Sequence, residues 1–248
     1  MYDKSTSLMK RVLSLIASIE TSMKAPLCFA RVAGDFDGAG ISFGIFQWNI
    51  GQNTLQPLLK QFFTRHESIA KNIFGLKFDE FKGLLAKSLA EQLDWAKKIQ
   101  SKNKLLPPYD SLFKNLGLTK EFQDIQIESA KFYFDRGVKM ANEYGLKSEV
   151  GIALMVDIAV QNGSINSATK NLILKEIEQK GFKDNEKEKM RIIANRRAEA
   201  ANPKWIEDVR KRKLMFVEGG GAIHGINYKL SEEYAIDSSV ANVNNSVV

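Results

Sequence analysis

The stretch GDFDGAGISFGIFQWNIG, from Gly34 to Gly51, combines closely spaced glycines with short apolar runs. Such a pattern is typical of a small hairpin or sheet and not of a helix. It predicts this structure for residues 26–51, followed by a helix that begins near Thr54. Asp35 and Asp37 lie in its first turn, where glycines allow positive φ and a close approach of the backbone to a ligand. Asp37 is therefore a candidate for chemistry, although a turn aspartate that bonds its own backbone is common.

A helix is predicted before this stretch, from Ser7 to Glu20. Its apolar residues recur at three- and four-residue spacing: Leu8, Val12, Leu15, Ile16 and Ile19. Glu20 therefore ends an apolar helix, where partial burial would raise its pKa and suit it to act as a general acid. The alternative is a surface glutamate at a helix terminus, and spacing alone favours that alternative.

The remaining chain is predicted to be mostly helical. The expected helices cover residues 55–63, 78–99, 121–144, 148–162, 167–180, 186–199 and 203–217. Pro107 and Pro108 cannot continue a helix, so residues 102–108 are the expected hinge between two helical lobes that flank a cleft. Residues 1–237 are expected to form one catalytic domain, and the polar residues 238–248 a flexible tail.

The amino-acid composition and net charge exclude some classes of protein but do not select a single one. The 36 Lys and Arg exceed the 29 Asp and Glu, giving a net charge of +7 that favours anionic partners such as cell-wall polymers, nucleic acid or acidic lipid. The densest basic cluster, residues 209–214, is interpreted as a solvated helix face, so neither nucleic acid nor membrane is the expected partner. The single cysteine, Cys28, excludes an internal disulfide and is interpreted as a small buried hydrophobe.

No metal or cofactor is expected. The DFDG sequence resembles the start of a calcium loop, but Ala39 and Phe46 stand where that loop needs oxygen ligands. Two histidines, His66 and His224, and one cysteine are too few for a typical zinc site. His224 lies in the glycine-rich sequence GGGAIHG, where it would either line a substrate cleft or cap a turn, and the pattern favours the turn.

The order of these motifs resembles the chitosanases of glycoside hydrolase family 46 and the wider lysozyme superfamily. Those chitosanases have an acidic glutamate at a helix end and then a GDGRG-type turn, and here FDGAG takes the place of that turn. The resemblance implies a mainly α, lysozyme-like α+β fold. It also implies Glu20 as general acid and Asp37 as the base of an inverting mechanism, with Asp35 in reserve. The turn lacks the family's arginine, which puts chitosan specificity in doubt.

A later segment carries the same resemblance. EYGLKSEVGIALMVDIAVQNG, from Glu143 to Gly163, has the Gly-Leu start, small residues and aspartate before a glycine that these chitosanases show. By that match, Asp157 is implied to join a buried ion-pair network with a downstream arginine. The candidates for the arginine are Arg196, Arg197 and Arg210.

A looser resemblance reaches bacterial and phage proteins similar to peptidoglycan hydrolases. It rests on the segments from Gly34 to Gln52 and from Arg212 to Tyr228. Because peptidoglycan and its attached polymers are anionic whereas chitosan is a polycation, the net charge favours a muramidase-like hydrolase of β-1,4 bonds. The alternatives are a chitosanase and a glycan-binding module without catalysis.

Sugars are held by amide hydrogen bonds and by stacking on aromatic rings, so the expected subsite residues follow the first turn. They are Gln47, Trp48, Asn49 and Gln52, together with His224. Core packing is an equally good account of Trp48.

The expected partner is a polysaccharide, and an immunity protein or a secretion machine is a further one. The N-terminal sequence has no continuous apolar segment and no clear cleavage site, so no signal peptide is expected. Action in the periplasm or cell wall would then follow release by a holin, as for a phage lysis enzyme, or injection as an antibacterial effector.

Overall fold

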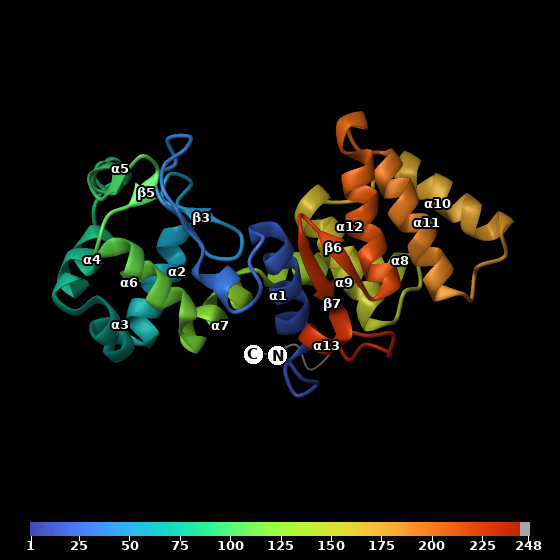
Figure 1. The fold of residues 1–248 in the computed structure, drawn as a ribbon, viewed down its shortest axis with the longest axis horizontal. Coiled ribbons are helices and arrows are strands. Elements are labelled where there is room, and N and C mark those ends of the chain that lie inside the picture. Colours follow the sequence, from blue (N-terminus) through green and yellow to red (C-terminus); the bar gives the residue numbers. More distant parts are fainter. Residues whose placement is uncertain (244–248) are drawn as a thin grey trace. The chain divides into compact units, whose positions relative to one another are not determined.

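The computed structural model describes residues 1–243 and consists mainly of helices with short antiparallel sheets (Figure 1). This confirms the predicted fold class. The chain forms two compact units. The terminal unit comprises Met1–Ile16 and Ala130–Val248, and the central unit comprises Ala17–Ser129.

The central unit begins with a small sheet that confirms the hairpin or sheet predicted after residue 26. Its strands pair antiparallel in the order β1-β2-β3, with Val32 opposite Phe43 and Phe43 opposite Trp48. The elements of this unit are η1 (Leu27–Ala30), β1 (Val32–Ala33), β2 (Ser42–Phe43), β3 (Trp48–Asn49), α2 (Leu55–Arg65), α3 (Glu67–Phe74), η2 (Gly75–Lys77), α4 (Phe78–Leu84), α5 (Leu89–Lys98), β4 (Gln100–Ser101), β5 (Lys104–Leu105), α6 (Tyr109–Leu118) and α7 (Lys120–Ser129).

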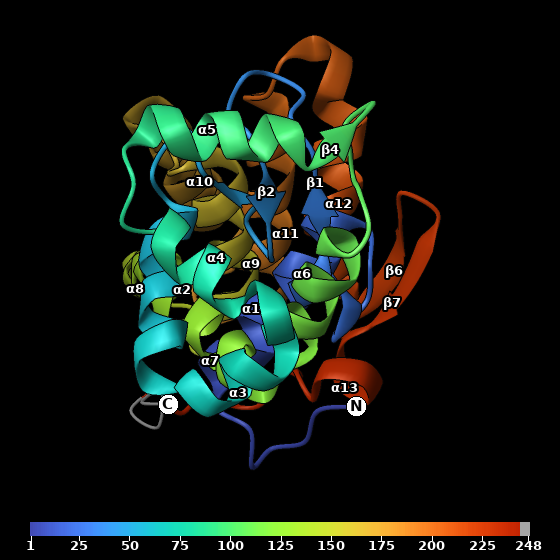
Figure 2. The ribbon, with the colours of Figure 1, turned by 90° about the vertical axis from the view of Figure 1, so that its left-hand side faces the viewer.

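Aromatic packing joins this sheet to helices of the central unit, whose backbone is drawn in Figure 2. The Phe43 ring on β2 lies 5.1 Å from Phe113 of α6 and 5.6 Å from Phe122 of α7, between ring centroids. Phe122 in turn meets Phe62 of α2 edge to face at 5.4 Å. All four rings are buried, so the short strands are held by a core that α2, α6 and α7 supply.

Two predicted helices are each divided in the structure. The helix predicted over residues 78–99 consists of α4 and α5, because Ser88 caps α5 and its hydroxyl accepts the Glu91 N–H while the Glu91 carboxylate accepts the Ser88 N–H. This reciprocal capping box starts a new helix. The helix predicted over residues 121–144 consists of α7 and α8 (Lys131–Glu143), which divide at Ala130.

The hinge predicted at residues 102–108 is wrong. Gln100 pairs with Leu105 and Ser101 with Lys104, so these residues close the β4–β5 hairpin within the central unit. The two prolines separate this hairpin from α6 and so precede a helix instead of ending one. The chain passes between the units inside α1 (Leu8–Thr21) and at the junction of α7 and α8.

The terminal unit is built around α9, which is buried along most of its length. Gly137 of α8 allows these two helices to meet closely, since a Cβ placed there would lie 2.6 Å from the Cα of Val156. The further elements of this unit are α8 (Lys131–Glu143), α9 (Glu149–Asn162), α10 (Ser167–Gln179), α11 (Glu186–Glu199), η3 (Pro203–Trp205), α12 (Ile206–Glu218), β6 (Gly220–Ile223), β7 (Ile226–Lys229) and α13 (Leu230–Tyr234).

The start of the predicted tail forms backbone hydrogen bonds with the residues around the start of α9. The Glu149 N–H donates to the carbonyl of Ser239 at 3.0 Å, and the Ala241 N–H donates to the carbonyl of Lys147 at 2.8 Å. These bonds pair the tail with the backbone at the start of α9. Flexibility of the tail stays a prediction, and residues 244–248 lie outside the described part of the chain.

Candidate functional site

Glu20 is the second-last residue of α1, as the sequence predicts. The helix stops at Thr21, because Ser22 has a positive φ of 52°. The Arg31 guanidinium donates to the Thr21 carbonyl at 2.6 Å and so places a cation at the negative end of the helix dipole. Glu20 is exposed, so the partial burial expected of a general acid is not found.

Asp35 and Asp37 lie in the loop between β1 and β2, which the β4–β5 hairpin anchors. The Asp35 N–H donates to Oε1 of Gln100 at 2.6 Å, and the Gly34 N–H donates to the carbonyl of Asn103 at 3.2 Å. A Cβ on Gly34 would lie 2.5 Å from that Gln100 oxygen, so only glycine fits this close approach. The loop that carries both carboxylates is thereby fixed by backbone contacts.

Both carboxylates also bond their own turn. Oδ1 of Asp35 accepts the Gly38 N–H at 2.6 Å, and Oδ1 of Asp37 accepts the Ala39 N–H at 3.1 Å. Asp35 is half-buried and Asp37 is exposed. Between them stands Phe36 with 73% of its surface exposed. The sequence analysis did not select Phe36 as a candidate sugar-contacting residue. The feature that could have indicated it is a large apolar side chain between two acids in a glycine-rich turn.

Of the predicted subsite residues, two amides have structural roles. Gln47, at a positive φ of 52°, donates through Nε2 to the carbonyls of Gly44 at 2.9 Å and Arg31 at 3.3 Å. Asn49 is buried, and its Oδ1 accepts the N–H of Gln52 at 2.8 Å. These side chains stabilise the turns on either side of β3.

Trp48 and Gln52 differ in exposure. The Trp48 ring is half-buried, packs on the hydrophobic core and meets Phe46 edge to face at 5.9 Å. Part of the Trp48 ring therefore packs in the core, which is the alternative to sugar binding that the sequence left open. The Gln52 side chain is exposed, close in sequence to this ring pair.

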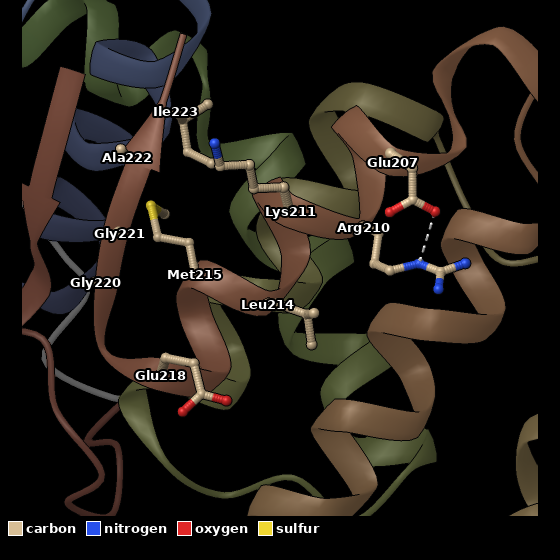
Figure 3. A pocket seen from close by; sticks show the side chains of 10 residues that line it. All are labelled: Glu207, Arg210, Lys211, Leu214, Met215, Glu218, Gly220, Gly221, Ala222 and Ile223. Carbon is tan, nitrogen blue, oxygen red and sulfur yellow. Dashed lines mark ion pairs between the residues drawn. The ribbon is translucent and has the colours of Figure 1, made fainter. Parts of the chain in front are cut away.

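His224 belongs to the terminal unit. It occupies the turn between β6 and β7 with a positive φ of 48°, and its Nε2 lies 3.1 Å from Oδ1 of Asp208. A groove of about 430 Å³ lies nearby between α12 and β6 (Figure 3). Met215 and Ile223 are among its apolar lining residues, and the Glu207–Arg210 ion pair lies toward one end. The contact with Asp208 connects the β6–β7 turn to α12, and both interpretations of His224 stay predictions.

Asp157 is completely buried on α9 and contacts two cations of α12. Its Oδ1 accepts from Arg212 Nη2 at 2.6 Å, and its Oδ2 pairs with Lys213 Nζ, which also donates to Oε1 of Gln161 at 2.6 Å. Burial raises the pKa of Asp157, but the two cations lower it by more, so its pKa lies below the ordinary 3.8. The carboxylate is therefore held ionised.

The structure corrects the choice of partner for Asp157. Arg196 pairs with Glu176 and Glu199, and Arg210 pairs with Glu207 at 3.7 Å. Arg197 is half-buried, and burial lowers its pKa. The true partners lie in the basic cluster at residues 209–214, which was interpreted as solvated, although Arg212 and Lys213 face the interior.

Within residues 1–243, no group of three or more His, Cys, Asp or Glu side chains is arranged to hold a metal ion. None of the helices in that range is both long and apolar enough to span a bilayer.

Comparison with known proteins identifies the fold. No protein-family model and no curated protein matches the sequence. Among solved structures, a GH46 chitosanase from Gynuella sunshinyii in complex with chitotetraose matches with a TM-score of 0.51 and 11% identity, over 90% of this chain and 97% of that one. A second chitosanase complex matches with a TM-score of 0.51 and 15% identity, over 89% and 95% of the two chains. The chain therefore has the mainly α, lysozyme-like fold of these chitosanases.

Proposed function

We propose that this protein is a glycoside hydrolase in which Glu20 is the general acid and Asp37 the base. The observation that carries the proposal is the chitosanase-like fold over 90% of the chain, together with a glutamate at the end of α1 and an aspartate in the β1–β2 loop of the same unit. Glycosidic cleavage needs two such carboxyl groups, one to protonate the leaving oxygen and one to activate water or attack the sugar.

In the proposed mechanism Glu20 protonates the glycosidic oxygen while Asp37 orients a water for attack on the opposite face of the sugar. This course inverts the anomeric configuration and requires carboxyl groups roughly 6.5–9.5 Å apart in the substrate complex. Asp35 is the reserve base, although its short bond to the Gly38 N–H favours a role in shaping the turn. Phe36 offers an exposed ring against which the apolar face of a sugar can stack.

We propose peptidoglycan as the substrate and chitosan as the alternative. The net charge of +7 attracts an anionic polymer and repels a polycation at long range. Ala39 stands where the family 46 turn has an arginine, so a contact of that turn is missing here. The proposed action is at the cell wall after release by a holin or a secretion machine, and an immunity protein is the partner expected in the second case.

A non-catalytic glycan-binding module is the second candidate. It is favoured by the exposure of Glu20 and by the hydrogen bonds that both aspartates make to their own turn. Such a module would bind glycan through Phe36 and the neighbouring loop without releasing product.

The test is to incubate purified wild type and Glu20→Gln with sacculi and with chitosan, and to identify soluble products by mass spectrometry. Glu178→Gln is the matched control, because Glu178 is also an exposed, second-last residue of a helix. We expect muropeptides from wild type and Glu178→Gln and none from Glu20→Gln. Chitosan oligomers instead would identify a chitosanase.

Two further results bear on the roles of the acids. Unchanged turnover in Asp37→Asn together with none in Asp35→Asn would assign the base to Asp35. Glycan binding by Glu20→Gln, with no product from wild type on either polymer, would replace the enzyme by the binding module.

A further inference from the structure

Two adjoining hollows in the terminal unit form what we call the basic groove. Their volumes are about 230 and 480 Å³, and they share Glu143 and Tyr144 in their linings. Arg136 and Lys139 of α8 line the smaller hollow. The cations of the larger hollow are Lys147, Lys183 and Lys189.

Four of these cations lack a carboxylate partner in the part of the chain that the structure describes. Within the described residues, no ion pair is formed by Arg136, Lys139, Lys147 or Lys183. They differ in this from most other basic side chains of the unit, such as Lys131, Lys170 and Lys180, which pair with Asp135, Glu143 and Glu176. Free cations that line a concave surface are the electrostatic arrangement that recognises an anion.

The acids of the groove are largely engaged elsewhere. Glu143 pairs with Lys170 at 2.5 Å. The Glu186 carboxylate accepts the N–H groups of Lys147 and Ser148 at 3.0 and 2.9 Å, as well as the Ser148 hydroxyl, at the start of α9. Asp184 remains as an exposed acid, so the groove keeps a positive balance.

Lys189 gives the groove a buried cation. It is 7% exposed, and among residues 1–243 its Nζ donates only to the carbonyls of Tyr144 and Gly145, at 3.2 and 2.9 Å. An ammonium group has three donors, so two neutral carbonyls leave one donor and the whole charge without an anion. A buried charge is stabilised when an opposite charge reaches it.

We propose that the basic groove binds a phosphodiester group of a linear anionic polymer. Lysine binds phosphate as a compact point charge, and cations spread over two hollows suit charges repeated along a chain better than one small ion. The cations belong to the terminal unit, whereas Glu20 and Asp37 belong to the central unit. The inference is therefore independent of glycoside hydrolysis.

The test measures binding of a fluorescently labelled glycerol-phosphate polymer by anisotropy, using the full chain. The test variant is Lys147→Glu/Lys183→Glu. The control is Lys60→Glu/Lys87→Glu, which changes the net charge by the same amount. Both control lysines are exposed in the central unit and form no ion pair in the described structure. We expect the first variant to lose affinity about tenfold or more and the control less than twofold. Lys147→Arg/Lys183→Arg should bind as the wild type does, and binding should weaken with salt.

Three outcomes would overturn the proposal: no binding of the polymer by wild type, an equal loss in both Glu variants, or a loss that accompanies unfolding in circular dichroism. Inorganic phosphate and phosphatidylglycerol vesicles are the comparison ligands. Vesicle binding that depends on Lys147 and Lys183, without polymer binding, would assign the groove to a lipid surface instead. Since no turnover is measured, a failed hydrolase assignment would leave this result unaffected.

Discussion

Asp157 is the carboxylate that neutralises two buried cations in the interior of the terminal unit. One buried carboxylate faces both Arg212 and Lys213, so removing its charge leaves two buried cations without an anion. We expect Asp157→Asn to lower the free energy of unfolding by about 3–5 kcal/mol, as found for other broken buried ion pairs. Urea denaturation checks this value. A loss below 1 kcal/mol would contradict it.

The same carboxylate predicts a pH dependence. Its pKa is lower in the folded protein than the ordinary 3.8, so its stabilisation is complete above that value and is lost as the pH falls through the folded pKa. The difference in stability between wild type and Asp157→Asn should therefore shrink below about pH 4, as this carboxylate becomes protonated. Denaturation series between pH 7 and 3 measure it, and a difference that grows on acidification would refute the assignment.

Cys28 is predicted to be chemically inert. Burial raises the pKa of its thiol from 9.0 to about 12, and the thiolate is the reactive form. A thiol-specific chromogenic reagent should therefore react with the unfolded chain and not with the native protein at pH 8. Rapid reaction under native conditions would show that the side chain is accessible.

At the scale of elements, the contact between α8 and α9 depends on one glycine. Gly137→Ala would place a methyl group 2.6 Å from the Val156 backbone, so we expect a loss of about 1–3 kcal/mol in stability. Gly83→Ala is the control, because Gly83 lies within α4 with open space around it and should gain roughly 0.5–1 kcal/mol. Thermal unfolding of both variants distinguishes packing from helix propensity.

Helices and strands could be predicted where the pattern of neighbouring residues alone determines them. The 3.6-residue period located α1 and placed Glu20 near its end. The division of α4 from α5 was also present in the sequence, since Ser88 and Glu91 have capping-box spacing, but the apolar pattern across it was taken as continuous. The β4–β5 hairpin escaped prediction because two-residue strands give no period to read.

The sequence predicted where the candidate site residues lie along the chain, but not which groups surround their side chains. The glycines around Asp35 and Asp37 indicated a turn, and the structure contains one. The structural use of Gln47 and Asn49 depends on carbonyls and N–H groups that only the folded turns bring near. The partners of Asp157 depend on which side of α12 meets α9, and a helix of low amphipathicity does not reveal that side.

At the scale of the whole molecule, the terminal unit is discontinuous in sequence. Arg11 of α1 donates to Oε1 of Glu149 at 2.7 Å, and Tyr2 stacks on Tyr234 with ring centroids 6.1 Å apart. We expect a fragment of residues 130–248 not to fold cooperatively, and the same fragment linked to residues 1–16 to do so. Near-ultraviolet circular dichroism during heating tests this prediction, which a cooperative transition of the shorter fragment would exclude.

The path of α1 also has a consequence during biosynthesis. The helix that carries Glu20 begins among residues that pair with α9 and α13, both of which leave the ribosome more than a hundred residues later. Until then its apolar side lacks its native cover, a condition that exposes nascent chains to aggregation and to chaperones.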